Sequence, residues 1–397
     1  MNKKISLGIA ISLIAIACAI TFVVTMTVSL NLYNAKIAGV QQREEINTRL
    51  QEIDSFVRSY SLYDVNNETG RNGVYSGYLA GLSDPYARYY TTDEYYYKTM
   101  IESGVLTGLG FETENDGGYV KVSSVYAGSP AEEAGIAVGD VISAIGGVGV
   151  LELGYDAAAY QLRFGDEGTR TVLLVRRGGE ENEITLTRAA FEIRSVTSAY
   201  LDNGIIYLRL GTINGKTGGQ VAAAIEGHMT DGEAAGYIFD LRDCTSGNYA
   251  AVSEVLAPFV SATTIANAVY RDGAARAEVE TTAERYTDLP ISVIVNERTG
   301  GAAELIAATL RDFNGARLVG VGTMGYGTLQ DTRSFGDGTA VEITVAEIVP
   351  YFAESKYDGA GLTPEFLVEY AGTAETAPEN YAASYDTQYK KAIEVLG

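Results

Sequence analysis

The feature that most constrains this chain is an apolar run near its N-terminus, residues 5–30, which contains no charged side chain. At about 1.5 Å per residue, a helix of this length crosses the ~30 Å hydrocarbon core of a bilayer with some tilt. A cleaved signal peptide has a shorter apolar stretch, so the run favours a retained anchor. Lys3 and Lys4 precede it, and Lys36 and Arg43 lie farther away on the other side. This asymmetry predicts a single-pass protein of the cell membrane with its soluble part extracytoplasmic.

Cysteine, histidine and net charge limit the chemistry of the soluble part. Cys18 lies in the apolar run, within a stretch resembling a lipoprotein cleavage box, which leaves lipidation at Cys18 as an alternative. Cys244 is the second of two cysteines, so a disulfide framework is excluded. The one histidine, His228, excludes a multi-histidine metal site, and its context predicts a surface or capping residue at a helix end. The formal charge of −22 excludes a nucleic-acid partner. No cofactor or metal motif is present.

Residues 36–103 are predicted to form a helical region that follows the 1–35 stub and anchor. Apolar residues recur at helical spacing between 42 and 60, at Ile46, Leu50, Ile53 and Val57. This face is either a dimer seam or a surface that packs on the chain's own domain, and the sequence leaves both open. The polar stretch 66–72 is expected to be a turn-rich break. A further helix is expected to begin near residues 91–95, capped by threonine or aspartate.

Residues 104–190 have the punctuation of a compact module of their own. Strands are expected at 118–125, 140–145 and 170–176, and a helix at 156–164. Residues 129–135 predict a short helix, because proline occupies its first turn, carboxylates lie near its N-terminus and glycine follows its end.

Three segments of this module resemble a PDZ domain of the circularly permuted bacterial kind. They are Gly108-Leu109-Gly110-Phe111, residues 128–136 and residues 138–142, in the order that the resemblance requires. Consecutive backbone N–H groups in such a glycine-bearing loop form a nest for a C-terminal carboxylate, and the adjoining strand edge accepts a peptide. We therefore expect Gly108, Leu109, Gly110 and Phe111 to bind protein or peptide C-termini.

Residues 191–372 alternate between strand and helix patterns, and 373–397 form a C-terminal tail or helix. The alternation predicts an α/β (α+β) domain in which helices cover a sheet. Strands are expected at 204–210, 236–242, 291–295, 317–321 and 340–345, and helices at 219–229, 249–260 and 302–311.

Five motifs of the soluble chain resemble those of the carboxyl-terminal processing (tail-specific) serine peptidases, and they occur in that family's order from about residue 40 to 370. They are Asp84-Pro85-Tyr86, Asp240-Leu241-Arg242-Asp243, the segment from Val295 to Glu304, the segment from Gly322 to Gln330, and Gly361-Leu362-Thr363-Pro364-Glu365. The resemblance implies a PDZ domain followed by a ClpP/crotonase-like peptidase domain. It also implies a serine nucleophile with a lysine base, and proteolysis of protein C-terminal regions.

The chain departs from this pattern at both catalytic positions. Counting back from Glu304, Gly301 stands where the family has its nucleophilic serine, and Tyr326 stands where it has its lysine, whereas Gln330 keeps its place. No lysine occurs between Lys216 and Lys356, so a shifted alignment restores nothing. A serine becomes a nucleophile when a neighbouring base takes its proton, and a glycine has no attacking atom.

The predicted oxyanion region has also changed. The family's Pro-Gly-Gly reads Thr245-Ser246-Gly247 here, so Ser246, Gly247 and Ala302 are expected to form a vestigial oxyanion region. Thr299 is a conceivable substitute nucleophile, although capping or turn chemistry explains it better. Cys244 paired with His228 is another, although a cysteine at a strand end is more often a small buried hydrophobe.

Three functions remain open on the sequence. The first is a membrane-anchored pseudopeptidase that binds C-terminal tails, or that regulates or scaffolds an active peptidase partner. The second is an active serine-type endopeptidase that cleaves protein C-terminal regions with non-standard residues. The third is a structural envelope protein with an inactive PDZ groove. The pair Gly301 and Tyr326 favours the first over the second, and the intact segment 108–111 favours the first over the third.

Overall fold

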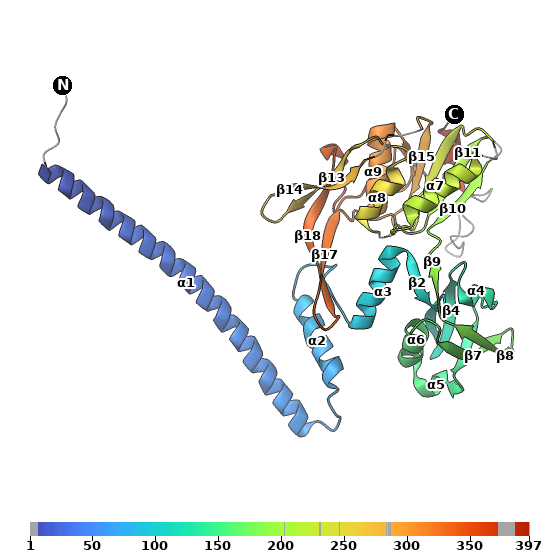
Figure 1. Ribbon diagram of the computed structural model, residues 1–397, viewed down its shortest axis with the longest axis horizontal. Coiled ribbons are helices and arrows are strands. Elements are labelled where there is room, and N and C mark those ends of the chain that lie inside the picture. The colour runs from blue at the N-terminus through green and yellow to red at the C-terminus, as the bar shows by residue number, and fades with distance from the viewer. Residues whose placement is uncertain are drawn as a thin grey trace. The chain divides into compact units, whose positions relative to one another are not determined.

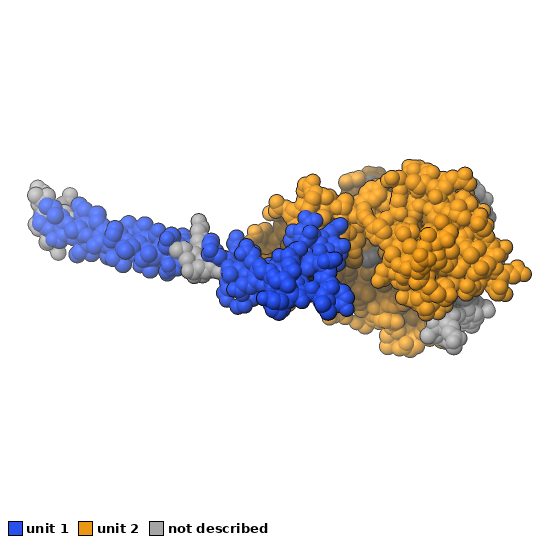
Figure 2. Space-filling view, turned by 90° about the horizontal axis from the view of Figure 1, so that it is seen from below, with its two compact units in different colours: residues 1–75 blue, residues 76–397 orange. Residues whose placement is uncertain are grey.

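The computed structural model describes residues 7–201, 203–229, 232–245, 247–282, 284, 287–371 and 386–396. Two compact units divide the chain, residues 1–75 and residues 76–397 (Figure 2). Each unit has its own internal contacts.

The first unit is dominated by one helix, α1 (Leu7–Tyr60), which runs without interruption through the predicted anchor and the predicted helix beyond it (Figure 1). Within α1, Ile11–Asn34 has a mean hydropathy of 2.5, which is long and apolar enough to cross a membrane. A signal sequence has the same character. Ile5 and the preceding lysines lie outside the described residues. The two predicted elements are therefore halves of a single rod about 80 Å long.

The predicted break over 66–72 is wrong, because a second helix, α2 (Asn67–Leu79), begins there. Asn66 accepts hydrogen bonds through Oδ1 from the backbone N–H groups of Glu68 and Thr69, at 3.0 and 3.1 Å. This cap satisfies donors of the first turn, and Glu68 adds an acidic side chain near the helix N-terminus. The break falls instead at residues 61–66.

A short strand and a helix lie near the start of the larger unit. Strand β1 (Arg88–Tyr90) is followed by α3 (Thr92–Ser103). Thr91 caps α3 through a capping box with Glu94, which confirms the predicted threonine cap, and Gly104 ends the helix in the left-handed conformation.

The module predicted over 104–190 is an antiparallel sheet wrapped around its own core. The sheet order is β3-β4-β5-β7-β8, with β6 beside β5, and a separate ribbon pairs β2 with β9. Val120, Ile142, Leu173 and others form its buried cluster. The bounds 104 and 190 remain our proposal. Its elements are β2 (Val105–Gly108), β3 (Phe111–Asp116), β4 (Tyr119–Val125), α4 (Pro130–Glu133), β5 (Val141–Ile145), β6 (Val148–Gly149), α5 (Val150–Leu153), α6 (Tyr155–Arg163), β7 (Arg170–Arg177), β8 (Glu180–Thr187) and β9 (Ala189–Glu192).

The C-terminal part contains a six-stranded sheet of order β10-β11-β12-β15-β16-β19, parallel from β11 onward. The predicted helices and strands are present, with ends that differ by a few residues, and the strand predicted over 340–345 extends to Pro350. The elements are β10 (Val196–Tyr200), β11 (Ile205–Leu210), α7 (Thr217–His228), β12 (Gly236–Asp240), α8 (Tyr249–Leu256), β15 (Ile291–Val295), α9 (Ala302–Asn314), β16 (Arg317–Gly320), β19 (Phe366–Leu367) and α10 (Thr387–Glu394).

Alternation along the central strands explains why helices cover both faces of this sheet. In β11, Ile206 and Leu208 belong to the main core with residues of α7, α8 and α9. Ile205 and Tyr207 point to the other face, where Ala392 of α10 packs. Because successive strand residues face opposite sides, a strand buried on both faces reads as a continuous apolar run.

A second sheet, of order β1-β18-β13-β14 with β17 beside β18, completes this part (Figure 1). Four of its five strands escaped the sequence analysis: β1, β13 (Thr263–Tyr270), β14 (Ala275–Thr281) and β17 (Thr328–Ser334). The fifth, β18 (Ala340–Pro350), pairs with β1, β13 and β17. This sheet carries Gln330 and the strand that follows Tyr86.

Candidate functional site

The turn between β15 and α9 carries Gly301, the residue that the sequence resemblance places at the nucleophile position. Thr299 lies in this turn, fully buried, and its hydroxyl donates to the Leu241 carbonyl at 2.9 Å and accepts from the Asn296 N–H at 3.0 Å. Gly301 follows with φ +61° and ψ −120° at the start of α9. A strained strand-to-helix turn is how a nucleophile elbow exposes its serine. Here a turn of that kind carries a glycine.

Glu304 ties this turn to the loop that carries Tyr326. Its carboxylate is fully buried in the first turn of α9. Burial raises the pKa of Glu304, and the hydrogen bonds that it accepts act in the opposite direction. The four donors are the N–H groups of Gly301 (3.0 Å), Gly325 (2.7 Å) and Tyr326 (2.8 Å) and the hydroxyl of Thr323.

Both the hydroxyl and the ring of Tyr326 are held by neighbouring side chains. Its phenol donates to Gln330 Oε1 at 2.6 Å, and Gln330 Nε2 donates in turn to the hydroxyls of Thr328 (2.9 Å) and Thr344 (3.1 Å). Its ring stacks on Tyr86, with centroids 4.2 Å apart. Burial raises the pKa of the Tyr326 phenol above its ordinary value.

The Asp84-Pro85-Tyr86 motif positions that stacking partner. Asp84 accepts hydrogen bonds from the N–H and the hydroxyl of Thr344, at 2.8 and 3.0 Å, and from the N–H of Tyr86 at 3.0 Å. Burial opposes ionisation of Asp84, but the hydrogen bonds outweigh it and hold its pKa below the ordinary value. The motif thus fixes Tyr86 beside Tyr326.

A cavity of about 710 Å³ lies over these residues. Gly247, Gly301, Tyr326 and Gln330 all line it, so the structure brings four of the predicted site residues together. Among the described residues, the lining contains no serine and no cysteine. The remaining walls come from α3, α8, the end of α6 and the β17–β18 hairpin.

Of the predicted oxyanion region, the structure describes Gly247 and Ala302. Gly247 bridges to Ile213, and a Cβ at Gly247 would lie 2.5 Å from the Ile213 Cβ, so this close approach requires glycine. Ala302 is buried as the first residue of α9 and does not line the cavity. Ser246 lies outside the described residues.

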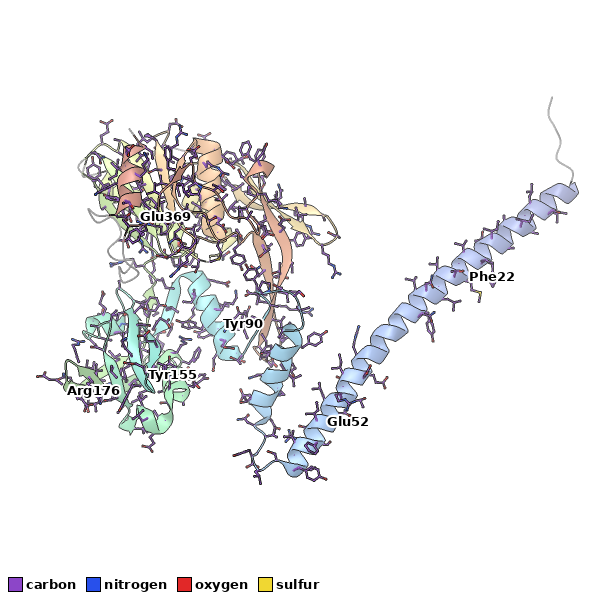
Figure 3. The ribbon with its side chains drawn as sticks, turned by 180° about the vertical axis from the view of Figure 1, so that it is seen from behind. Phe22, Glu52, Tyr90, Tyr155, Arg176 and Glu369 are labelled. Carbon is purple, nitrogen blue, oxygen red and sulfur yellow. The ribbon has the colours of Figure 1, made fainter. Side chains whose placement is uncertain are left out.

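Lys98 of α3 is a lining residue that the sequence analysis missed. Its ammonium forms ion pairs with Glu342, at 2.8 Å, and with Glu102. Burial lowers the pKa of Lys98, but the two carboxylates outweigh burial and raise it. Glu342 also accepts a hydrogen bond from Tyr90, labelled in Figure 3, at 2.9 Å. A lysine that serves as a general base needs a depressed pKa, so Lys98 is an ammonium here and not a base.

Cys244, the second candidate substitute nucleophile, is in an environment that makes its thiol unreactive. Cys244 is fully buried, and burial raises the pKa of its thiol to about 12. A thiol with such a pKa is inert. His228 is the last residue of α7, where its Nε2 lies 3.0 Å from the Ser198 Oγ, which agrees with the predicted helix-end histidine.

The predicted carboxylate nest forms the bend between β2 and β3. Gly110 has φ +94°, and a Cβ there would lie 2.1 Å from the Ser129 Cβ, so glycine is required. The Ser129 hydroxyl donates to the Gly110 carbonyl at 3.1 Å. Because β3 is an edge strand of its sheet, one side of it is open to strand addition. Gly108, Leu109, Gly110 and Phe111 all line a second cavity, of about 20 Å³.

Helix α3 borders both cavities, because Tyr97 lines each of them. Its phenol donates to Glu112 Oε1 at 2.6 Å, and Tyr126 donates to the same oxygen at 2.9 Å. Arg163 at the end of α6 forms an ion pair with Glu112 at 2.9 Å and also lines both cavities. Tyr97 and Tyr126 thus both line the second cavity and are tied to Glu112 there.

Comparisons with known proteins follow the same division of the chain. Residues 204–368 match the model of peptidase family S41, and residues 121–177 match that of a PDZ domain. A carboxyl-terminal-processing protease of Synechocystis is 32% identical over 332 residues, which cover 80% of this chain and 75% of that protein. The carboxy-terminal processing protease CtpA of Bacillus subtilis is 28% identical over 352 residues, covering 87% and 74%.

Among solved structures, a putative S41 protease from Bacteroides fragilis has the same fold. Its TM-score is 0.51 at 17% sequence identity, and the match covers 87% of this chain and 96% of that one.

Proposed function

Since this chain belongs to peptidase family S41 and carries a PDZ domain, we propose that it is a pseudopeptidase that binds protein C-terminal tails. One observation supports the proposal: Gly301 and the stacked, hydrogen-bonded Tyr326, which the resemblance places at the serine and lysine positions, line one cavity.

Four described residues in or near the cavity do not supply the lost groups. Gly301 offers no attacking atom. The Tyr326 phenol has a raised pKa and donates its proton to Gln330, so it is a poor base at neutral pH. Lys98 is held as an ammonium by two carboxylates. Thr299 uses its hydroxyl to hold the turn. Without an activated nucleophile, acyl transfer loses most of its rate.

The two replacements also fit each other. A Cβ on Gly301 would lie 3.3 Å from Tyr326 Cδ1, closer than ordinary van der Waals contact. The tyrosine ring therefore favours glycine at 301, and glycine at 301 leaves room for the ring. Mutual packing of this kind supports a site rebuilt around binding.

Two features of the PDZ domain support tail recognition. Gly110, in the predicted nest segment 108–111, has a positive φ, and the adjoining strand β3 lies at the edge of its sheet. The cavity of about 710 Å³ is large enough to hold several side chains of a peptide. We propose that a tail bound at the PDZ domain extends toward this cavity, and that the protein regulates a partner peptidase by holding tails without cleaving them.

We further propose that Ile11–Asn34 of α1 anchors the protein as a single pass, with the N-terminus cytoplasmic and the part after the anchor extracytoplasmic. The support is the length and hydropathy of this segment and the charge asymmetry around it.

The test is binding of matched peptides by residues 42–397. Fluorescent peptides of one sequence, with a free C-terminal carboxylate or a C-terminal amide, are titrated and followed by anisotropy. We expect the free carboxylate to bind and the amide to bind at least tenfold more weakly, because a charge-assisted interaction with the nest is lost. A serine-directed covalent probe is expected to leave binding unchanged and the protein unlabelled. Equal binding of both peptides would contradict tail recognition.

A further inference from the structure

Carboxylates outnumber basic side chains on the wall of the cavity of about 710 Å³. Of its described lining residues, four are glutamates and three are lysine or arginine. All three basic side chains are already in ion pairs: Arg88 with Glu94 at 3.5 Å, Lys98 with Glu102 and Glu342, and Arg163 with Glu112 at 2.9 Å. The fourth lining glutamate, Glu278 of β14, is exposed and forms no ion pair within the described part of the chain. The unbalanced charge on this wall is therefore negative.

A further carboxylate, that of Asp84, lies beside the stacked rings of Tyr86 and Tyr326. Its hydrogen-bond donors are neutral: the N–H and hydroxyl of Thr344 and the N–H of Tyr86. Burial opposes ionisation of Asp84 and of Glu342, but hydrogen bonds hold the pKa of each below its ordinary value, so both are charged at neutral pH. Burial is the main cause of the raised pKa of the Tyr326 phenol, and the charges of Glu342 and Asp84 add to it. The ring of Tyr326 thus lies in a negative potential.

The ring itself is accessible from the cavity. Tyr86 covers one face of Tyr326, with the ring centroids 4.2 Å apart and the planes inclined by 22°, and Tyr86 does not line the cavity. The part of the Tyr326 ring that lines the cavity is the part that Tyr86 leaves free. Beside it, Gly301 carries no side chain, and a Cβ there would lie 3.3 Å from Tyr326 Cδ1. Because the face of an aromatic ring is partly negative, a cation placed over it is attracted.

The wall also suits the rest of a long basic side chain. The Tyr326 phenol donates to Gln330 Oε1, so its own oxygen keeps a lone pair for a donor from the ligand. Ammonium and guanidinium groups are donors with no acceptor. Ile101, Ile213 and Leu329 supply apolar surface for the methylene groups that connect such a head group to the backbone.

We propose that the cavity takes a lysine or arginine side chain of a bound tail, with its cationic group over the Tyr326 ring beside Gly301. This inference rests on the proposed tail binding and names the chemical class of the tail, which is basic. The formal charge of −22 favours the same class, because it attracts positively charged segments from a distance.

The test compares lysine with acetyl-lysine, which has a similar length and no charge. Fluorescent peptides of one sequence, each with a free C-terminal carboxylate, carry either residue at successive positions before the C-terminus. Binding to full-length protein in a neutral detergent is followed by anisotropy at about 0.15 M salt, where a Debye length of about 8 Å screens remote surface charges. At one or more positions, we expect lysine to bind about five- to tenfold more tightly. Equal binding of the two residues at every position would overturn the proposal.

Two matched pairs of variants locate the charge that is read. Glu342→Gln is expected to lower the preference for lysine several-fold, and Glu278→Gln to lower it about twofold. Glu347→Gln on β18 and Glu280→Gln on β14 remove the same charge from the same two strands, away from the cavity lining, and are expected to leave the preference unchanged. An equal fall in the controls would assign the preference to overall charge and overturn the subsite. Because Glu278 is exposed, its variant tests the charge even where Glu342→Gln destabilises the protein.

Substitutions at residue 326 test the role of the ring. Tyr326→Phe keeps the ring and is expected to keep most of the preference for lysine, whereas Tyr326→Leu is expected to lose it several-fold. An unchanged preference in Tyr326→Leu would overturn the placement of the cation.

Peptides with a C-terminal amide separate this inference from the proposed function. Binding that needs the free carboxylate but does not distinguish lysine from acetyl-lysine refutes the basic subsite alone. If no peptide binds in either form, tail recognition fails and the subsite fails with it.

Discussion

Placing a serine at residue 301 gives a quantitative test of how the site is built. Gly301 has φ +61° and ψ −120°, and holding a side chain in such a sparsely populated conformation costs about 1–3 kcal/mol. The added Cβ also meets Tyr326 Cδ1 at 3.3 Å, and crowding in a packed site adds about 1–2 kcal/mol. We therefore expect Gly301→Ser to lower the free energy of unfolding by about 2–5 kcal/mol.

The crowding part disappears when the ring is removed, so the two positions are energetically coupled. In the Tyr326→Lys background, Gly301→Ser is expected to cost about 1–2 kcal/mol less than it does in the wild type. The assay is a double-mutant cycle on residues 42–397, by urea unfolding with circular dichroism. Effects that add within about 0.3–0.5 kcal/mol would refute the mutual packing of the pair. The same double variant is expected to regain weak proteolysis, and its complete inactivity when folded would count against a vestigial site.

Three further predictions concern the surroundings of the site. Glu304→Gln places an amide NH2 against buried N–H donors, from which it cannot accept, and is expected to lower the free energy of unfolding by about 2–4 kcal/mol in urea unfolding. The control Glu297→Gln, on the exposed part of the turn, is expected to change it little. Asp84 has a lowered pKa in the folded protein, so its contribution to stability is present above its ordinary pKa and is lost as the pH falls through the folded pKa. Asp84→Asn should therefore reduce the fall of the melting temperature with acidification in thermal melts. An unchanged fall would contradict the hydrogen bonding of Asp84 to Thr344. Tyr97→Ala widens the small PDZ cavity and is expected to tighten tail binding several-fold by anisotropy, an effect that weaker binding would exclude.

Patterns that depend on neighbours in the sequence predicted their part of the fold well. The Thr91 cap, the Ser129 helix and the β11–β12 strands follow from local chemistry and periodicity. No break forms over 66–72, because the Asn66 cap and Glu68 outweigh Gly70 and the remaining polar residues of that stretch.

The candidate site likewise contains residues that local motifs predicted and one that only a tertiary contact reveals. Gly301, Tyr326 and Gln330 were found because motifs fix their spacing, and they line one cavity. Lys98 was missed because it comes from a helix more than 200 positions upstream, and its ion pair with Glu342 depends on a tertiary contact that no local pattern encodes.

The central claim, binding without cleavage, is tested most directly by searching for new peptide ends. Residues 42–397 are incubated at high concentration with unfolded proteins and with peptides that carry free C-termini, and the mixture is analysed by mass spectrometry. The account predicts intact substrates and bound tails, with no new termini above a substrate-alone control. New termini that appear with the wild type and vanish with Thr299→Ala or Cys244→Ala would show that catalysis has moved to another residue, and would contradict the account.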